Sequence, residues 1–298
     1  MSQKLNDALD FASSLRAKQS GQGQPDEISV DPNFIEDQAA AKVIEFAIKR
    51  RKNCLVYGPT GCGKSSLVIN IAARLKERLE IFSCSGETSV DELIGKPWKK
   101  PSGEMVTVYG AAMRAYKDGK GLLIEEVDHG LADVLTPLHR AMEINQKFYV
   151  LNIGEQEVVA KSKDFFVLAT SNTIGTGEDS FMYSGTKPLN AAFMNRFSLT
   201  VRLDYISPDK EKLVLMAKTG IDANTAEALV RVGVEARKAQ KQDIDRIVTM
   251  VSTRDLLEWA DAIVGMKINP KDAATYVFLN RASESDRDVL EKIVENVF

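Results

Sequence analysis

A glycine-rich segment with a single lysine carries the clearest chemistry in the sequence. It reads Gly58-Pro59-Thr60-Gly61-Cys62-Gly63-Lys64-Ser65 and is followed by Ser66. The spacing fits G-x-x-x-x-G-K-[ST], in which the glycines let the loop turn its amide N–H groups toward a phosphate. Lys64 would neutralise charge on the β- and γ-phosphates, and the Ser65 hydroxyl would bind Mg²⁺. A glycine-rich turn without a ligand would leave the lysine unexplained, so the pattern predicts that these nine residues bind ATP with Mg²⁺.

Two adjacent carboxylates, Glu125 and Glu126, form a second candidate group. They follow the apolar run Leu122-Leu123-Ile124, which is typical of a buried strand. At the end of a parallel strand, the first acid would hold Mg²⁺ through water, and the second would polarise the attacking water. Adjacent acids on a surface turn are the alternative, but the apolar run before them argues against it. We expect Glu125 to bind the metal and Glu126 to act as the catalytic base.

Short apolar runs alternate with helical patterns over the first two thirds of the chain and would position both groups. Runs typical of strands occupy residues 53–57, 80–84, 121–124, 165–169 and 199–203. Apolar residues at helical spacing occupy residues 37–49, 64–78 and 132–144. Strand, helix, strand is the signature of a parallel sheet covered on both faces. Residues 148–160 predict a hairpin around Gly154.

After Pro208 the pattern changes, and only helices are expected. They cover residues 209–219, 223–240, 254–264, 271–280 and 286–297. Asp222, Thr253 and Ser285 are the expected N-caps of three of them. The prediction is an α/β protein in three parts, namely a tail and linker over 1–28, a nucleotide-binding domain over 29–206 and a smaller helical domain over 207–298.

The composition is that of an ordinary globular protein without a strong charge. The 298 residues include 39 basic and 42 acidic side chains, a net charge of −3, which does not favour nucleic acid or an anionic membrane as a partner. Cys54, Cys62 and Cys84, with His129 and His139, lack the spacing of a zinc site. The sequence shows neither an export signal nor an apolar run of the roughly 18 residues that a membrane span needs, so we expect a cytoplasmic protein.

Several ordered segments resemble the MoxR-like group of the AAA+ superfamily, with its relatives CbbQ, NorQ and the small subunit of aerobic cobaltochelatase. The similar segments are GPTGCGKSS, SGETSVDELIGK, LLIEEVDHGLADVLTPLHRAME, KFYVLNIGEQEVVAKSKDFFVLATSNT and GTKPLNAAFMNRF. The resemblance covers about residues 30–265. It implies a P-loop AAA+ core, with a parallel sheet between helices, followed by a C-terminal helical lid.

The resemblance also assigns roles to three further residues. Asn172 matches sensor 1, a polar amide that orients the water near the γ-phosphate. Arg196 matches the arginine finger, which reaches the γ-phosphate of a neighbouring subunit, and Arg254 matches sensor 2 of the lid. Alone, each would be an ordinary turn or surface residue, so these roles rest on the resemblance.

The function implied by the resemblance is ATP-driven remodelling of a protein client. Such proteins form a ring, commonly a hexamer, work with a von Willebrand factor A domain partner, and act in metal-cofactor insertion or enzyme activation. Two residues depart from the group's pattern, since Glu125 stands where aspartate is usual and Cys62 where a smaller residue is. The longer acid leaves a catalytically weak nucleotide-binding switch as an alternative. For Cys62 two alternatives stay open, namely an inert thiol and a thiol that makes the site sensitive to oxidation.

Two other classes of function are weighed against this one. A nucleic-acid-directed motor or loader would use the basic stretch at residues 96–100, whose simpler interpretation is a solvated loop. A small-molecule phosphotransferase would need neither Arg196 as a finger nor the helical domain. Both are less favoured than a protein remodeller.

Overall fold

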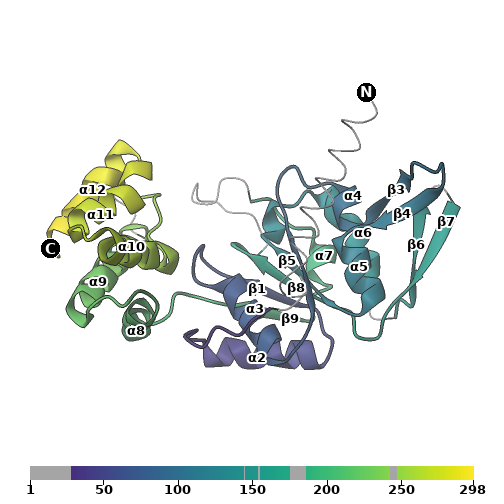
Figure 1. The fold of residues 1–298 in the computed structure, drawn as a ribbon, viewed down its shortest axis with the longest axis horizontal. Helices are drawn as coiled ribbons and strands as arrows, with labels where there is room; N and C mark the ends of the chain where they lie inside the picture. Colours follow the sequence, from purple (N-terminus) through teal and green to yellow (C-terminus); the bar gives the residue numbers. More distant parts are fainter. Residues whose placement is uncertain (1–27, 144, 154, 175–185, 242–246) are drawn as a thin grey trace.

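The structure, a computed structural model, describes residues 28–143, 145–153, 155–174, 186–241 and 247–298. Figure 1 shows an α/β part followed by a bundle of helices, as the sequence predicts. The expected tail lies outside the described residues up to position 27, and so does Gly154 in the predicted hairpin.

Five parallel strands form the central sheet, in the order β2-β5-β8-β1-β9. They are β1 (Cys54–Tyr57), β2 (Leu79–Ser83), β5 (Gly121–Glu125), β8 (Phe166–Ser171) and β9 (Leu199–Arg202). The predicted parallel sheet is therefore confirmed, with each strand within two residues of its expected bounds. The three middle strands are buried on both faces, which explains why their sequences are apolar without alternation.

Helices cover both faces of this sheet. On one face lie α2 (Gln38–Lys49) and α3 (Lys64–Arg74), which pack against Cys54 and Val56 of β1. On the other face, Leu55 packs into a cluster with α5 (Ala111–Asp118), α6 (Ala132–Ala141) and α7 (Ala191–Met194). The helix expected over 64–78 is shorter because Lys76 adopts a left-handed φ of 57°, which ends it before β2.

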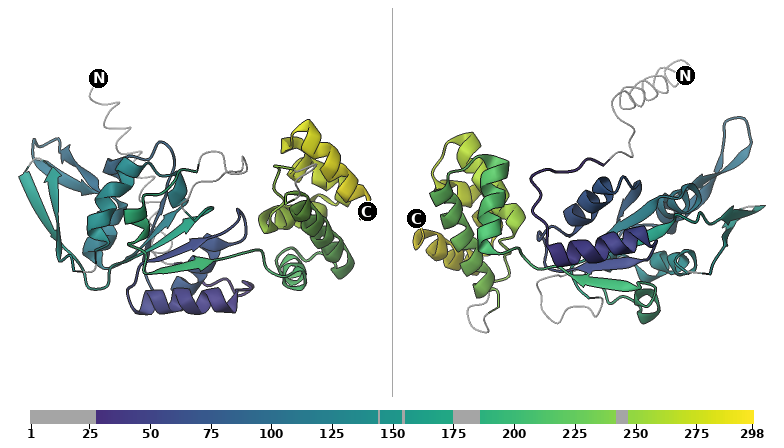
Figure 2. Two further views of the ribbon diagram at one scale, coloured as in Figure 1. Left: turned by 180° about the vertical axis from the view of Figure 1, so that it is seen from behind. Right: turned by 90° about the horizontal axis from the view of Figure 1, so that it is seen from below.

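Two hairpins extend the α/β part at the end remote from the helical bundle (Figure 2). The hairpin expected over 148–160 is confirmed as β6 (Phe148–Ile153) paired antiparallel with β7 (Glu155–Ala160). The other, β3 (Gly95–Lys99) with β4 (Met105–Tyr109), follows the short helix α4 (Val90–Leu93). The basic stretch at 96–100, interpreted as a loop, therefore lies mainly on a strand.

The C-terminal part is built from helices around one apolar core. They are α8 (Pro208–Thr219), α9 (Ala223–Ala239), α10 (Thr253–Met266), α11 (Pro270–Val277) and α12 (Glu284–Glu295). Trp259 is fully buried there, and its ring meets the Phe278 ring edge to face, with the two ring centroids 5.1 Å apart. A short 3-10 turn, Leu279–Arg281, joins α11 to α12, so the helix expected over 271–280 ends early.

Two of the three predicted helix caps are wrong by one or two positions. Asp222 caps α9 as expected, because its side chain accepts the N–H groups of the first turn. The cap of α10 is Ser252 rather than Thr253, and that of α12 is Ser283 rather than Ser285. Each true cap accepts the N–H of an aspartate three residues later, which is the spacing that a side-chain cap requires.

A buried asparagine at the start of β1 joins three elements of the α/β part. Asn53 is 8% exposed, and its Nδ2 donates to the carbonyl oxygens of Met142 at 3.1 Å and Arg196 at 3.0 Å. Its Oδ1 accepts the N–H of Val167 in β8 at 3.0 Å. All of these backbone groups would otherwise lack a partner in an apolar environment, which is costly.

We predict that Asn53→Ala lowers the free energy of unfolding by about 2–3 kcal/mol, because it leaves buried backbone groups without hydrogen bonds. Denaturant titration followed by circular dichroism measures the change. The matched control is Asn280→Ala at an exposed position, where we expect a change within about 0.5 kcal/mol. Equal stability of the two variants would contradict the role of Asn53.

Candidate nucleotide-binding site

The carboxyl ends of three adjacent strands bring the predicted site residues together. In the order β5-β8-β1, Glu125 ends the first strand, Asn172 follows the second and Gly58 follows the third. Parallel strands present their carboxyl ends at one edge of the sheet, where ligands of α/β folds bind. The acidic pair, Asn172 and the glycine-rich loop, 58–65, therefore share this edge.

The backbone of this loop depends on its glycines. Gly61 and Gly63 adopt left-handed φ angles of 72° and 94°, which side chains disfavour. A Cβ atom on Gly58 would lie 1.8 Å from the carbonyl oxygen of Leu203, so only glycine fits there. Among the described residues, no side chain caps the start of α3 at Gly63, and its first N–H groups are therefore available to an anion.

Lys64 points back across the loop to Asn172. Its Nζ donates to Gly58 O at 2.8 Å, Pro59 O at 3.0 Å and Asn172 Oδ1 at 2.9 Å. Burial lowers the pKa of Lys64, and the positive charge of Arg254 also lowers it, while the carboxylates of Asp128 and Glu126 raise it. The structure thus places Lys64 and Asn172 in direct contact. Asp128, Glu126 and Arg254 are close enough to influence the charge on the lysine.

The two adjacent acids point in different directions. Glu125 accepts a hydrogen bond from the Ser83 hydroxyl at 2.8 Å, which holds its carboxylate at the sheet edge. Glu126 has a left-handed φ of 53°, and 61% of its side chain is exposed. A non-glycine residue in this region is strained, and such residues cluster at functional sites. The exposed carboxylate of Glu126 lies 3.9 Å from Nδ1 of His129 and is accessible to a water molecule and a substrate.

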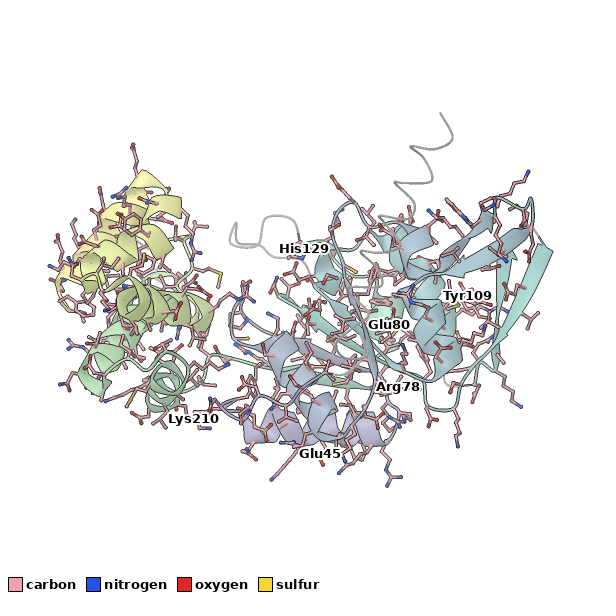
Figure 3. The ribbon with its side chains drawn as sticks, viewed as in Figure 1. Glu45, Arg78, Glu80, Tyr109, His129 and Lys210 are labelled. Carbon is pink, nitrogen blue, oxygen red and sulfur yellow. The ribbon has the colours of Figure 1, made fainter. Side chains whose placement is uncertain are left out.

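Asp128 belongs to the site, although its role could not be assigned from the sequence. Its side chain is fully buried and accepts the N–H groups of Asn172 at 3.0 Å and Thr173 at 3.2 Å. Its other oxygen lies 3.6 Å from Nδ1 of His129, which Figure 3 shows near the lid side of the sheet edge. Asp128 is therefore placed to fix the backbone of Asn172, and burial excludes it as an exposed base. The one sequence signal that could have identified Asp128 is its position three residues after Glu125.

Arg254 enters the site from the helical part, at the start of α10. Ser252, two residues before Arg254, packs closely on Gly61. A Cβ atom on Gly61 would lie 2.3 Å from the Ser252 hydroxyl oxygen. The same Cβ would lie 3.7 Å from Cβ of Arg254. A cavity of about 360 Å³ lies between the glycine-rich loop, α10 and an N-terminal segment, 29–35. The sequence did not identify this segment, because nothing in its residues signals a ligand.

Cys62 is a packing residue in this structure. It is 9% exposed, and its thiol lies 3.9 Å from the carbonyl oxygen of Leu203. Burial raises the pKa of the Cys62 thiol, against the opposing charge of Lys64. A protonated, buried thiol is a poor nucleophile, so of the two alternatives for Cys62 the structure favours the inert thiol.

Arg196 lies at the opposite edge of the sheet from the glycine-rich loop. Its carbonyl oxygen is held by Asn53 at the amino end of β1, and its guanidinium pairs with Glu143 at 3.0 Å. From Asn53 to Gly58 the strand rises by about 16 Å, at roughly 3.3 Å per residue. The structure therefore does not bring Arg196 to the loop of its own chain.

Family profiles match both parts of the chain. The AAA domain (dynein-related subfamily) matches residues 53–197, and the CbbQ/NirQ/NorQ C-terminal domain matches residues 211–297. The chain belongs to the MoxR-like group of AAA+ ATPases. Its α/β part is the P-loop AAA+ fold, and the family to which it belongs is one of ATP hydrolases.

Named relatives of this AAA+ ATPase agree with that assignment. Aerobic cobaltochelatase subunit CobS of Sinorhizobium sp is 28% identical over 279 residues, covering 90% of this chain and 82% of CobS. Protein NorQ of Paracoccus denitrificans (strain Pd 1222) is 27% identical over 218 residues, covering 73% of this chain and 77% of NorQ. The Thermotoga maritima RuvB Holliday junction branch migration motor superimposes with a TM-score of 0.51 at 17% identity, covering 91% of this chain and 72% of RuvB, and shows a shared fold.

Among the residues that the structure describes, every helix is too short or too polar to cross a membrane.

We predict that Lys64→Ala loses detectable ATP binding, because the P-loop then lacks the side chain that neutralises the phosphates. Isothermal titration calorimetry gives the affinity, and a thermal melt shows whether the variant is folded. Lys42→Ala, at an exposed position of α2, serves as the control and should bind like the wild type. Unchanged affinity of the folded Lys64→Ala variant would remove the lysine from the nucleotide site.

Proposed function

We propose that copies of this chain assemble into a ring, which we expect to be a hexamer. The ring hydrolyses ATP at its subunit interfaces and uses the energy to remodel a protein client. The observation that carries the proposal is the position of Arg196. Its partners Asn53 and Glu143 hold it at the sheet edge opposite the P-loop, with about a third of its side chain exposed. An arginine there can complete the site of a neighbouring chain and not its own, so hydrolysis requires assembly.

The residues at the P-loop fit ATP and Mg²⁺. Left-handed glycines and the uncapped start of α3 offer N–H groups to phosphates, and Lys64 adds a positive charge. The described residues hold no cluster of three His, Cys, Asp or Glu side chains that could bind a metal alone. Mg²⁺ commonly uses one carboxylate, a hydroxyl and the substrate phosphates, which suits Ser65 and Glu125. Bound there, it would neutralise charge on the phosphates.

Three residues divide the work of hydrolysis in this proposal. The exposed carboxylate of Glu126 accepts the proton of the attacking water. Asn172, whose backbone is held by Asp128, orients that water with its side-chain amide. Arg254, beside Gly61 in the lid, contacts the phosphates from the other side of the nucleotide. The cavity that includes residues 29–35 accommodates the nucleoside.

The client is a protein in this proposal, and it is reached with a von Willebrand factor A domain partner. The name of CobS as a cobaltochelatase subunit supports metal-cofactor insertion as the process. The balanced charge of the chain fits a protein client better than nucleic acid.

A second candidate is a nucleic-acid-directed motor. One observation favours it, namely that Trp98 is 55% exposed on β3 between Lys96 and Lys99. Exposed aromatic rings among basic residues bind single strands by stacking and charge. Stimulation of ATP turnover by DNA or RNA, but not by a protein client, would favour this candidate.

We predict that Glu126→Gln still binds ATP but hydrolyses it at least about 100-fold more slowly, because the proton acceptor is lost while the P-loop is kept. Turnover of phosphate and calorimetric affinity are measured on the same preparation. The control is Glu87→Gln at an exposed site, which should turn over normally. Near-normal turnover of Glu126→Gln would exclude Glu126 as the base, and slow turnover of the wild type itself would favour a nucleotide switch.

The same variant, loaded with ATP, is the means to test the client. Proteins retained by Glu126→Gln but released by Lys64→Ala are identified and then added back to the wild type. A protein client is expected to raise the ATP turnover of the wild-type protein. Stimulation by nucleic acid alone would instead support the second candidate.

We predict that mixing Arg196→Ala with Lys64→Ala subunits restores part of the ATP turnover that each lacks alone. A mixed interface pairs an intact P-loop with an intact finger, and a finger contributes ~10³-fold or more in rate. Specific activity of the wild type should also rise with protein concentration as the ring assembles, which light scattering follows.

The control for mixing combines Arg196→Ala subunits with subunits that carry both Glu126→Gln and Lys64→Ala. These double-variant subunits keep the finger but have no working ATP site. They should rescue Arg196→Ala no less well, because only the finger of the second subunit is used. Full turnover by a monomer, independent of concentration, would overturn the ring. Failure of rescue in a proven mixed ring would assign Arg196 a structural role.

A further inference from the structure

The segment that joins the two parts of the chain runs along the P-loop. Leu203, directly after β9, donates its N–H to Tyr57 O at 2.8 Å, and its carbonyl oxygen packs against Gly58. Two residues later, the Tyr205 hydroxyl donates to the carbonyl oxygen of Thr60 at 2.8 Å. The connection to the lid is therefore bonded to the loop that would hold the phosphates.

An arginine of the lid packs on the other side of Tyr205. The guanidinium carbon of Arg237, in α9, lies 3.9 Å from the centroid of the Tyr205 ring, which is a cation–π contact. Arg237 Nε donates to Val251 O at 2.9 Å, directly before the cap of α10. The side chain is 11% exposed, so its orientation is fixed by these contacts.

A fully buried glutamate continues the chain of contacts to α10. Glu211, in α8, accepts both terminal nitrogens of Arg237, at 2.8 and 3.0 Å. It also accepts the hydroxyl of Thr253, the residue next to Arg254. A bidentate pair of this kind fixes geometry as well as charge. Thr60, Tyr205, Arg237, Glu211 and Thr253 thus form one continuous path from the P-loop to Arg254.

We infer that Tyr205 and Arg237 are positioning residues, which set where Arg254 stands over the P-loop and pass movements of the loop to the lid. The Arg237–Glu211 pair would suffice to join α8, α9 and α10. The Tyr205 hydroxyl adds a link from the lid side to the phosphate loop, because it donates to the carbonyl oxygen of Thr60 in the P-loop. The inference rests on the proposed role of Arg254 at the phosphates.

Tyr205→Phe removes the hydroxyl and keeps the ring beneath Arg237. We expect kcat/KM for ATP to fall about five-fold, the value of one neutral hydrogen bond, with the melting temperature within about 2 °C of the wild type. The matched control is Tyr149→Phe, whose hydroxyl donates to Pro137 O at 3.3 Å away from the P-loop. It should leave kcat/KM unchanged. A folded Tyr205→Phe variant with wild-type kcat/KM overturns the inference.

A double-mutant cycle with Arg254→Ala separates positioning from a merely structural role. If Tyr205 acts through Arg254, Tyr205→Phe changes kcat/KM by less than about 1.5-fold when Arg254 is already alanine. The same five-fold loss in both backgrounds would overturn the inference while leaving the role of Arg254 intact. Wild-type kinetics of Arg254→Ala alone would instead overturn the proposed role of Arg254. Arg237→Lys, which keeps the charge but loses the bidentate pair, should follow the same pattern as Tyr205→Phe.

Discussion

Parallel pairing of β5, β8 and β1 is the constraint on which the whole nucleotide site depends. In this register Leu123 lies opposite Leu168, and Leu168 opposite Cys54, so the three strands end at the same level. Successive side chains of a strand point to opposite faces, and a slip of one residue would therefore turn the apolar set of each strand to the wrong helices. The apolar contacts on both faces fix the register, and the register in turn places the P-loop, the acidic pair and Asn172.

The strands and the P-loop could be predicted because their signals are local. A run such as Leu122-Leu123-Ile124 is apolar without alternation, since both faces are covered, and the glycine spacing of residues 58–63 reflects the turns of the loop itself. The hairpin of β3 and β4 escaped prediction because three lysines and a proline at 96–100 mask its pattern. These residues lie mainly on β3, an exposed edge strand, where charged residues and proline are tolerated.

The contacts that complete the site could not be predicted, because they join residues distant in the sequence. Tyr205 meets Thr60 across 145 positions, and Asp128 meets Asn172 across 44. No spacing rule reports such pairs. Glu211 is likewise an ordinary first-turn acid of α8 in the sequence, and only the fold shows it buried beneath Arg237.

Strand β1 joins the two functional edges of the domain. Its carboxyl end leads into the P-loop, while Asn53 before its amino end holds the carbonyl of Arg196. Four residues of buried strand thus fix the distance between the P-loop and Arg196. The lid is tied to this rigid unit by the bond from Tyr205 to Thr60 and by the close contact of Ser252 with Gly61.

Burying the Arg237–Glu211 pair adds little stability over an apolar packing, because both ions lose their hydration. With Trp259 and its neighbours already forming the lid core, the pair is better explained by the position it imposes on α10 than by the stability it contributes.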